Sequence, residues 1–211
     1  MEEIQHRLMR AGIWDEQLEM LLRALWKYGV MQIQDENLRS TVIKFLCVVP
    51  RIFYVDHASR SGNFHPWWQN GQNGTLRSIV ESVILLPPQS RHIRGLLNEA
   101  LEPNQHAMDV AYAATIISDT WKKEDHGDIH YGPEHGRIAA EHWRSFAHIK
   151  HLDAHVIEEV ADACYWHMGL YTPGATLTTP FTPVTELVNA CDVCTSHCEL
   201  GVIYEPKLVI V

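Results

Sequence analysis

Apolar residues recur at helical spacing along nearly the whole chain, and this periodicity constrains the fold more than any other feature. Within residues 15–28 the apolar stripe consists of Leu18, Leu21, Leu22, Leu25 and Trp26. Asp15 before this segment and Gly29 after it are typical helix-capping residues. The same pattern predicts further helices at 36–48, 76–86, 91–101, 105–123, 133–150, 154–168 and 183–200. We therefore expect a single all-α domain, a helical bundle spanning 1–211, in which the helices of residues 1–50 pack on the core formed by 51–200.

Capping residues and prolines mark where these helices begin and end. Ser90, Asn104, Asp153 and Thr182 are expected N-caps, and Pro87–Pro88 is expected to end the helix at 76–86. Residues 51–75 contain glycines, asparagines and several aromatic residues, and they predict a long loop. We expect residues 56–75 to be ordered and to cover a pocket, with His65 near its mouth. The alternative is that the aromatic residues only plug the end of the bundle. The tail, residues 202–211, is expected to be extended.

Charge and composition exclude some classes of protein. The chain has 17 Lys and Arg against 26 Asp and Glu, a formal net charge of −9, which argues against a protein that coats nucleic acid. No apolar run approaches the ~20 residues of a membrane span, and the first residues lack the core of a signal peptide, so a cytoplasmic protein without a membrane partner is expected. The 5 cysteines, an odd number, argue against a disulfide framework, whereas the 14 histidines point weakly to metal binding. Homo-oligomer formation is left open.

Several polar residues interrupt otherwise apolar helices. Ser118, Asp119 and Lys122 follow an apolar helical stretch that ends at Ile117, and His135 falls in the first turn of a helix. His167 lies at the end of another apolar helix, and Asp192 lies on an apolar helical face. A single residue of this kind is usually a core polar group that is satisfied by a hydrogen bond. Several together indicate a shared site, because a bundle core can hold a cation with carboxylates and imidazoles from different helices.

The sequence also resembles one branch of the HD-domain superfamily of metal-dependent phosphohydrolases. Its segment 56–83 matches the branch at Ala58, Ser59, Ser61, Gly62, His65, Pro66, Gly71, Gly74 and Arg77. Four later motifs, ISDTWK, EHGRIAAE, WHMGLYT and CDVCTS, follow in the order and spacing of that branch, so that the likeness covers about residues 53–197.

The resemblance implies an HD-domain-like bundle with a metal centre. Asp119 corresponds to the aspartate of the family's His-Asp pair and Asp192 to its distant aspartate, and His135 and His167 correspond to ligands of a second metal. Asp119 and Lys122 are the implied catalytic residues, with His65, Arg77 and Lys122 as phosphate- or substrate-binding residues. The implied substrate is a phosphorylated small molecule, a nucleotide or a related phosphoester.

Two departures from the family concern the first metal site. Its histidines fall on Ser78 and Ser118, and serine hydroxyls are poor ligands for zinc or iron. The remaining ligands, Asp119, Asp192, His135 and His167, would bind one divalent ion, Mn, Fe, Zn or Mg, if any. Three functions stay open: a phosphohydrolase with an altered centre, an inactive protein that binds a phosphorylated ligand or a protein partner, and, least favoured, a di-iron oxygenase.

Other clusters are weaker candidates. Cys191, Cys194 and Cys198 with His197 could hold zinc, but small cysteines lining a helix–helix contact are the better interpretation. A second stripe, formed by His148, His151 and His155, is expected to be a solvent-facing or interfacial surface. His126 and His130 either supply missing ligands or belong to a plain polar loop, and the loop is favoured.

Overall fold

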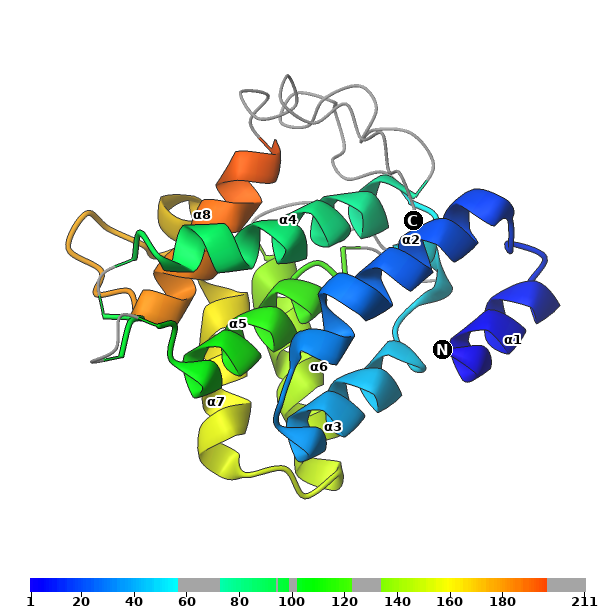
Figure 1. Cartoon of the computed structure of the whole chain (residues 1–211), viewed down its shortest axis with the longest axis horizontal. Coiled ribbons are helices and arrows are strands. Elements are labelled where there is room, and N and C mark those ends of the chain that lie inside the picture. The colour runs from blue at the N-terminus through cyan, green and yellow to red at the C-terminus, as the bar shows by residue number, and fades with distance from the viewer. Residues whose placement is uncertain (57–72, 94, 99–101, 123–133, 197–211) are drawn as a thin grey trace.

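The computed structural model of the chain describes residues 1–56, 73–93, 95–98, 102–122 and 134–196. Over these residues the protein consists of α-helices and short 3-10 turns with no strand, which confirms the predicted all-α class. The helices are α1 (Glu2–Arg10), α2 (Glu16–Tyr28), α3 (Glu36–Leu46), α4 (Gly74–Ser90), α5 (Gln105–Ile117), α6 (His135–Ile149), α7 (Ala154–Tyr165) and α8 (Pro183–Ser196) (Figure 1). None of the helices in the described part of the chain is long and apolar enough to cross a membrane.

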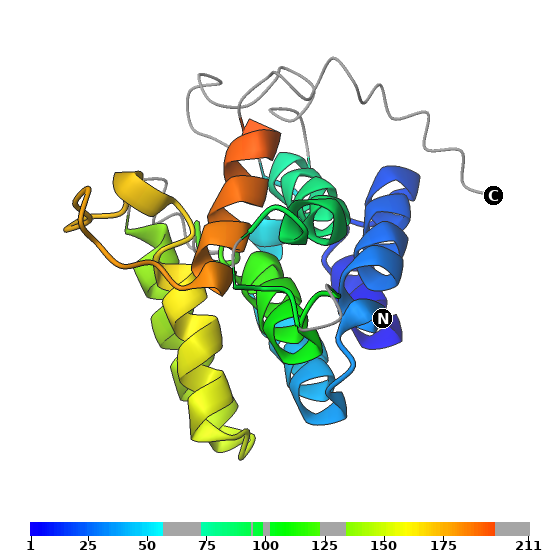
Figure 2. The same cartoon turned by 60° about the vertical axis from the view of Figure 1, so that its left-hand side comes forward.

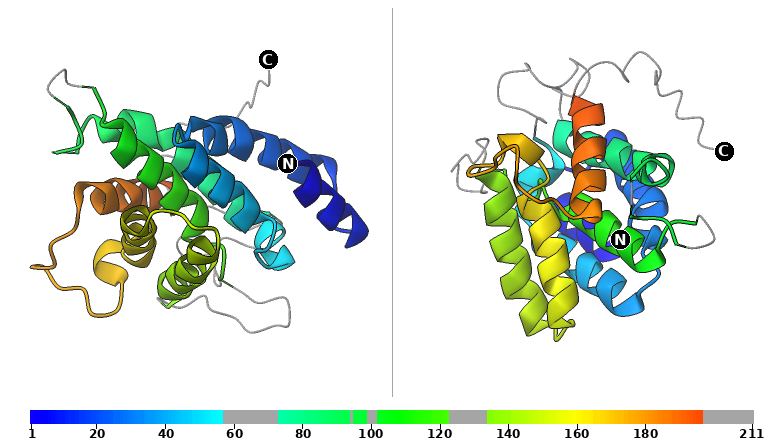
Figure 3. Two further views of the ribbon diagram at one scale, coloured as in Figure 1. Left: turned by 90° about the horizontal axis from the view of Figure 1, so that it is seen from below. Right: turned by 90° about the vertical axis from the view of Figure 1, so that its left-hand side faces the viewer.

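Helix α5 is the centre of the bundle. Every residue from Met108 to Ile117 is buried, and α5 packs against α3, α4, α6, α7 and α8. Figures 2 and 3 show α5 running through the middle, with α6 and α7 as an antiparallel pair on one side. On the other side α2 packs on α4, so the N-terminal helices belong to the same bundle. A polar side chain at the end of α5 therefore lies among several neighbouring helices.

The predicted N-caps explain where four helices begin. Asp15, Asn104 and Asp153 each accept a hydrogen bond from a backbone N–H in the first turn of the following helix. Thr182 does the same through its hydroxyl, which accepts from the N–H of Thr185. Each cap satisfies a donor that the helix itself leaves unpaired.

Two predicted elements were wrong. Helix α4 continues through Pro87 and Pro88 to Ser90, because Leu86 and Ser90 are fully buried and the φ angle of proline is compatible with a helix. Ser90 therefore ends a helix instead of capping the next one. The helix predicted at 91–101 is absent from its described residues, which form turns, and Gly95 has a φ of +90° that breaks a helix.

Helix α1, which the periodicity did not predict, is attached by its buried Ile4 and Leu8. Arg7 adds hydrogen bonds to the carbonyl oxygens of Cys47 and Val49, at 3.0 and 2.6 Å. The predicted ordered loop at 56–75, apart from its ends, and the extended tail at 202–211 lie outside the described residues.

Candidate metal centre

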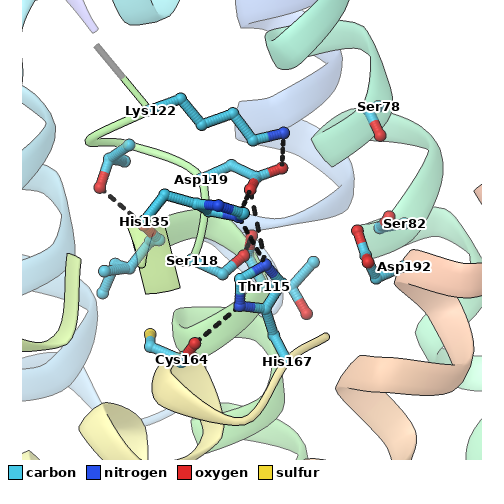
Figure 4. A network of polar contacts seen from close by, with 12 residues as sticks. Ser78, Ser82, Thr115, Ser118, Asp119, Lys122, His135, Cys164, His167 and Asp192 are labelled. Carbon is cyan, nitrogen blue, oxygen red and sulfur yellow. Dashed lines mark hydrogen bonds and ion pairs between the residues drawn. The ribbon is translucent and has the colours of Figure 1, made fainter. Parts of the chain in front are cut away.

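Three buried side chains from different helix ends meet beside the C-terminus of α5 (Figure 4). Asp119 lies in the turn that follows α5, His135 is the first residue of α6, and His167 lies two residues after α7. Their exposed fractions are 4%, 5% and 1%. The sequence prediction placed these three residues and Asp192 in one metal site, and the fold brings Asp119, His135 and His167 together.

The distances between their ligand atoms fit one coordination sphere. Nε2 of His135 lies 3.1 Å from Nε2 of His167 and 3.1 Å from Oδ1 of Asp119. Nε2 of His167 lies 3.6 Å from the same oxygen. Two ligand atoms that each lie 2.0–2.2 Å from one ion, with a ligand–metal–ligand angle of 90–110°, are about 3.0–3.5 Å apart. Two imidazoles and a carboxylate are also a donor set that Zn, Fe and Mn accept.

The imidazole of His167 is held in the orientation that a metal ligand needs. Its Nδ1 lies 2.7 Å from the carbonyl oxygen of Cys164. A carbonyl only accepts, so Nδ1 carries a proton, and the Nε2 of the neutral ring keeps a lone pair toward Asp119. The amide of Asn189 on α8 donates to the backbone oxygen of His167 at 2.8 Å and holds the turn from the other side.

Gly136 lets α6 approach this ring closely. A Cβ atom at this position would lie 2.9 Å from both Cε1 and Nδ1 of His167 and 2.8 Å from the carbonyl oxygen of Cys164. The absence of a side chain at Gly136 is therefore what allows His135, its neighbour, to come within 3.1 Å of His167.

The two carboxylate oxygens of Asp119 face different neighbours. Its Oδ2 forms an ion pair with Nζ of Lys122 at 2.8 Å. Its Oδ1, on the imidazole side, is buried and has no hydrogen bond of acceptable geometry among the described residues, although both Nε2 atoms lie near. A buried oxygen left in this way is costly unless a cation or proton satisfies it. Asp119 Oδ1 thus faces the place where an ion would lie.

The charges of the cluster follow from burial and from Asp119. Burial alone would raise the pKa of Asp119, but the charge of Lys122 and contact with the two imidazoles hold the pKa well below its usual range. Burial lowers the pKa of His135 more than Asp119 raises it. For His167 burial also acts downward, yet contact with Asp119 and the charge of Asp192 outweigh it and raise the pKa. Asp119 is therefore anionic, and His135 is the more easily neutral of the two imidazoles.

An aromatic cluster supports the turn that carries Asp119. The ring of Trp121 lies 5.2 Å from that of Phe45 on α3 and stacks on His142 of α6 at 4.2 Å between centroids. Phe45 also contacts Trp143 of α6 edge-on at 5.5 Å. The turn is thereby anchored between two helices, which reduces the movement of the carboxylate.

The other predicted residues of the site lie around this cluster without joining it. Asp192 on α8 lies on the side of α4 in Figure 4; its charge acts on His167, but its carboxylate is not among the three ligand atoms that meet within 4.8 Å. Ser78 on α4 contacts the hydroxyl of Thr195 at 3.5 Å. Ser118, the residue that follows α5, donates to the carbonyl oxygen of Thr115. These contacts of Ser78 and Ser118 do not involve the Asp119 cluster.

Arg77, predicted to bind substrate, lies in the first turn of α4, half-buried. His65, His126, His130, His197 and Cys198 lie outside the described residues. Cys191 is buried in the core and Cys194 lies 3.9 Å from the amide of Gln89 on α4, which agrees with a helix-contact role for this stripe.

Sequence reasoning missed two groups of functional interest. One is the support of His167 by Cys164 and Asn189, which backbone contacts and tertiary packing create and which no motif reveals. The other is a surface cluster of His106, His155 and Glu159 that joins α5 to α7. Only His155 had been singled out, in the stripe with His148 and His151; all three are exposed, as expected.

Searches of protein-family models, of curated proteins and of solved structures find no match for this chain.

Proposed function

We propose that the protein is a metal-dependent phosphohydrolase of the HD type, with one divalent ion held by Asp119, His135 and His167. The substrate class is a nucleotide or a related phosphoester. The resemblance of the sequence motifs supports the reaction class, and the three ligand residues come from three of those motifs in order.

One observation carries the proposal. Three buried donor atoms from three separate helix ends approach one another at 3.1, 3.1 and 3.6 Å. Side chains that served only packing would have no reason to bring two imidazole nitrogens within 3.1 and 3.6 Å of one buried carboxylate oxygen.

The chemistry divides between the ion and the chain. A divalent ion at this centre would supply a water of lowered pKa and offset the charge of a phosphoester. Asp119 anchors the ligand set and keeps its anionic form, because Lys122 lies 2.8 Å from Oδ2. Lys122, only 11% exposed in its side chain, also places a fixed positive charge beside the centre. This charge favours a phosphate group on that side.

The second candidate is an inactive protein of the same fold that binds a phosphorylated ligand or a protein partner. The ion pair between Lys122 and Asp119 favours it, because this pair partly neutralises the buried carboxylate without any metal. Ser78 and Ser118, with contacts of their own, supply no ligand in place of the family's imidazoles.

A hydrolysis assay separates these two functions. The chelator-treated protein is incubated with nucleotides of one to three phosphates and with Mn²⁺, Fe²⁺, Zn²⁺ or Mg²⁺ in turn. We expect metal-dependent phosphate release that is lost in His135→Ala and kept in His148→Ala. His148 is an exposed histidine on the same helix, so this variant is a matched control. Release that is equal in both variants, or absent with every metal, contradicts the phosphohydrolase and favours the binding protein.

Restoring the family's imidazoles gives an independent test. Ser78→His with Ser118→His places two further nitrogen donors on the α4 and α5 sides of Asp119. If the scaffold has the HD arrangement, the double variant binds one more equivalent of metal than the wild type. An unchanged metal content in a folded double variant contradicts that arrangement.

A further inference from the structure

A second group of metal-ligating side chains lies on the surface, away from the Asp119 centre. His106 lies in the first turn of α5, and His155 and Glu159 lie one turn apart on α7. Oε2 of Glu159 is 2.7 Å from Nε2 of His106 and 3.0 Å from Nδ1 of His155. His155 lies in the first turn of α7, whereas His167 follows its last residue, Tyr165. The ten helical positions from His155 to Tyr165 span about 15 Å at the rise of an α-helix.

We propose that His106, His155 and Glu159 form an exposed site for Zn²⁺ or a similar transition metal, which links the start of α5 to α7. The site is distinct from the proposed catalytic centre and does not depend on it. The three ligand atoms lie within 4.8 Å of one another.

The geometry of the three side chains suits such an ion. Two imidazoles and one carboxylate are donors that Zn, Cu and Ni accept, whereas Mg and Ca prefer oxygen alone. His155 and Glu159, four residues apart, project from the same face of α7, so the backbone already holds two of the three ligands side by side. His106 completes the set from a second helix, and the ion therefore crosslinks two elements of the bundle.

The three side chains are exposed to solvent, so an ion bound to them would also be open to water. Their exposed fractions are 52% for His106, 78% for His155 and 34% for Glu159. Three protein ligands leave at least one position of a tetrahedral ion for water or another donor. Without an ion, the carboxylate of Glu159 accepts a hydrogen bond from Nε2 of His106 and lies 3.0 Å from Nδ1 of His155. With an ion, each of these ring nitrogens gives a lone pair to the metal instead.

Titration with Zn²⁺ tests the proposal. Metal-free protein is titrated by calorimetry and its thermal unfolding is followed with and without one equivalent of Zn²⁺. The variants are His155→Ala and Glu159→Gln, with His6→Ala, an exposed histidine on α1, as the matched control. Circular dichroism confirms that each variant is folded.

We expect the affinity of the surface site for Zn²⁺ to fall at least tenfold in both cluster variants, so that one equivalent of bound Zn²⁺ is lost from the titration. His6→Ala should behave as the wild type. In the Asp119→Asn background the surface equivalent persists, so failure of the catalytic centre is seen separately from failure of this site. Titrations of His155→Ala and Glu159→Gln that superimpose on that of the wild type would overturn the proposal, as would Mg²⁺ binding as tightly as Zn²⁺.

Discussion

The imidazoles of His135 and His167 meet at their Nε2 atoms, 3.1 Å apart, although 32 positions separate the residues in the chain. Nδ1 of His167 is occupied by the carbonyl oxygen of Cys164. Two facing ring nitrogens at this distance must share either a proton or a cation, because two lone pairs would repel each other. The contact is therefore a place where a proton and a metal ion compete.

A methyl group at Gly136 should disrupt this contact. Its Cβ would lie 2.9 Å from two ring atoms of His167, so the ring must shift away from His135 and Asp119. We expect Gly136→Ala to weaken metal binding by at least tenfold in equilibrium dialysis with Zn²⁺. Alanine favours the helix more than glycine by about 1 kcal/mol, so unchanged affinity with higher stability would contradict this role of Gly136.

Asn189 should act as a positioning residue for His167. Its amide donates to the backbone oxygen of His167 and not to the ring nitrogen that would bind the metal. Loss of such a support typically lowers metal affinity 10–100-fold. We therefore expect Asn189→Ala to lower Zn²⁺ affinity by about tenfold while the metal:protein ratio at saturation stays the same. A changed ratio at saturation would show that Asn189 does more than position the histidine.

As the pH is lowered, metal affinity should begin to fall at a higher pH than at an ordinary histidine site. Burial lowers the pKa of His167, but Asp119 outweighs this and raises it, so protons compete for this ring above the usual value of about 6.5. Burial lowers the pKa of His135, so that ring stays neutral over this range. In the metal-free protein the stabilising contact of protonated His167 is present below 6.5 and is lost as pH rises through the raised pKa.

Zn²⁺ dissociation constants measured from pH 8.5 to 5.5 check this dependence. As the pH is lowered, we expect the affinity to begin to fall while the pH is still above 6.5. Near neutral pH, metal binding should release about one proton from the protein. An affinity that is constant down to pH 6 would contradict the assignment of His167 as a ligand.

Asp109 should contribute strongly to stability without affecting the metal centre. Its buried carboxylate accepts hydrogen bonds from the backbone N–H groups of Gln34 and Asp35, at 2.9 and 2.8 Å, and from the amide of Gln105. Asp109→Ala leaves two backbone donors unpaired, so we expect it to lower the free energy of unfolding by about 2–4 kcal/mol in urea titrations. Asp109→Asn, which keeps one acceptor, should cost less. Equal losses in the two variants would contradict this account.

The sequence predicted the helices best where capping and burial agree. Asp15, Asn104 and Asp153 marked true helix starts because an N-cap acts within a few residues. Pro87–Pro88 misled the prediction, because tertiary burial of Leu86 and Ser90 outweighs the local effect of proline. The turns after Ser90 depend on Gly95, whose positive φ the apolar pattern does not reveal.

Part of the candidate site could also be predicted from the sequence. Asp119, His135 and His167 stood out because charged or titratable groups beside apolar stretches need a partner. The support of His167 by the Cys164 carbonyl and by Asn189 could not be found in the sequence, since a backbone contact leaves no residue pattern. Glu159 and His106 lie on exposed positions of two helices, where polar residues are ordinary, and only the packing of α5 on α7 joins them.

Anomalous X-ray scattering from crystals grown with Zn²⁺ tests the central claim most directly. The account predicts a zinc peak about 2.0–2.2 Å from Nε2 of His135, Nε2 of His167 and Oδ1 of Asp119, absent from Asp119→Asn crystals grown in the same way. No peak at this centre in the wild type, with the two Nε2 atoms still 3.1 Å apart, would contradict it.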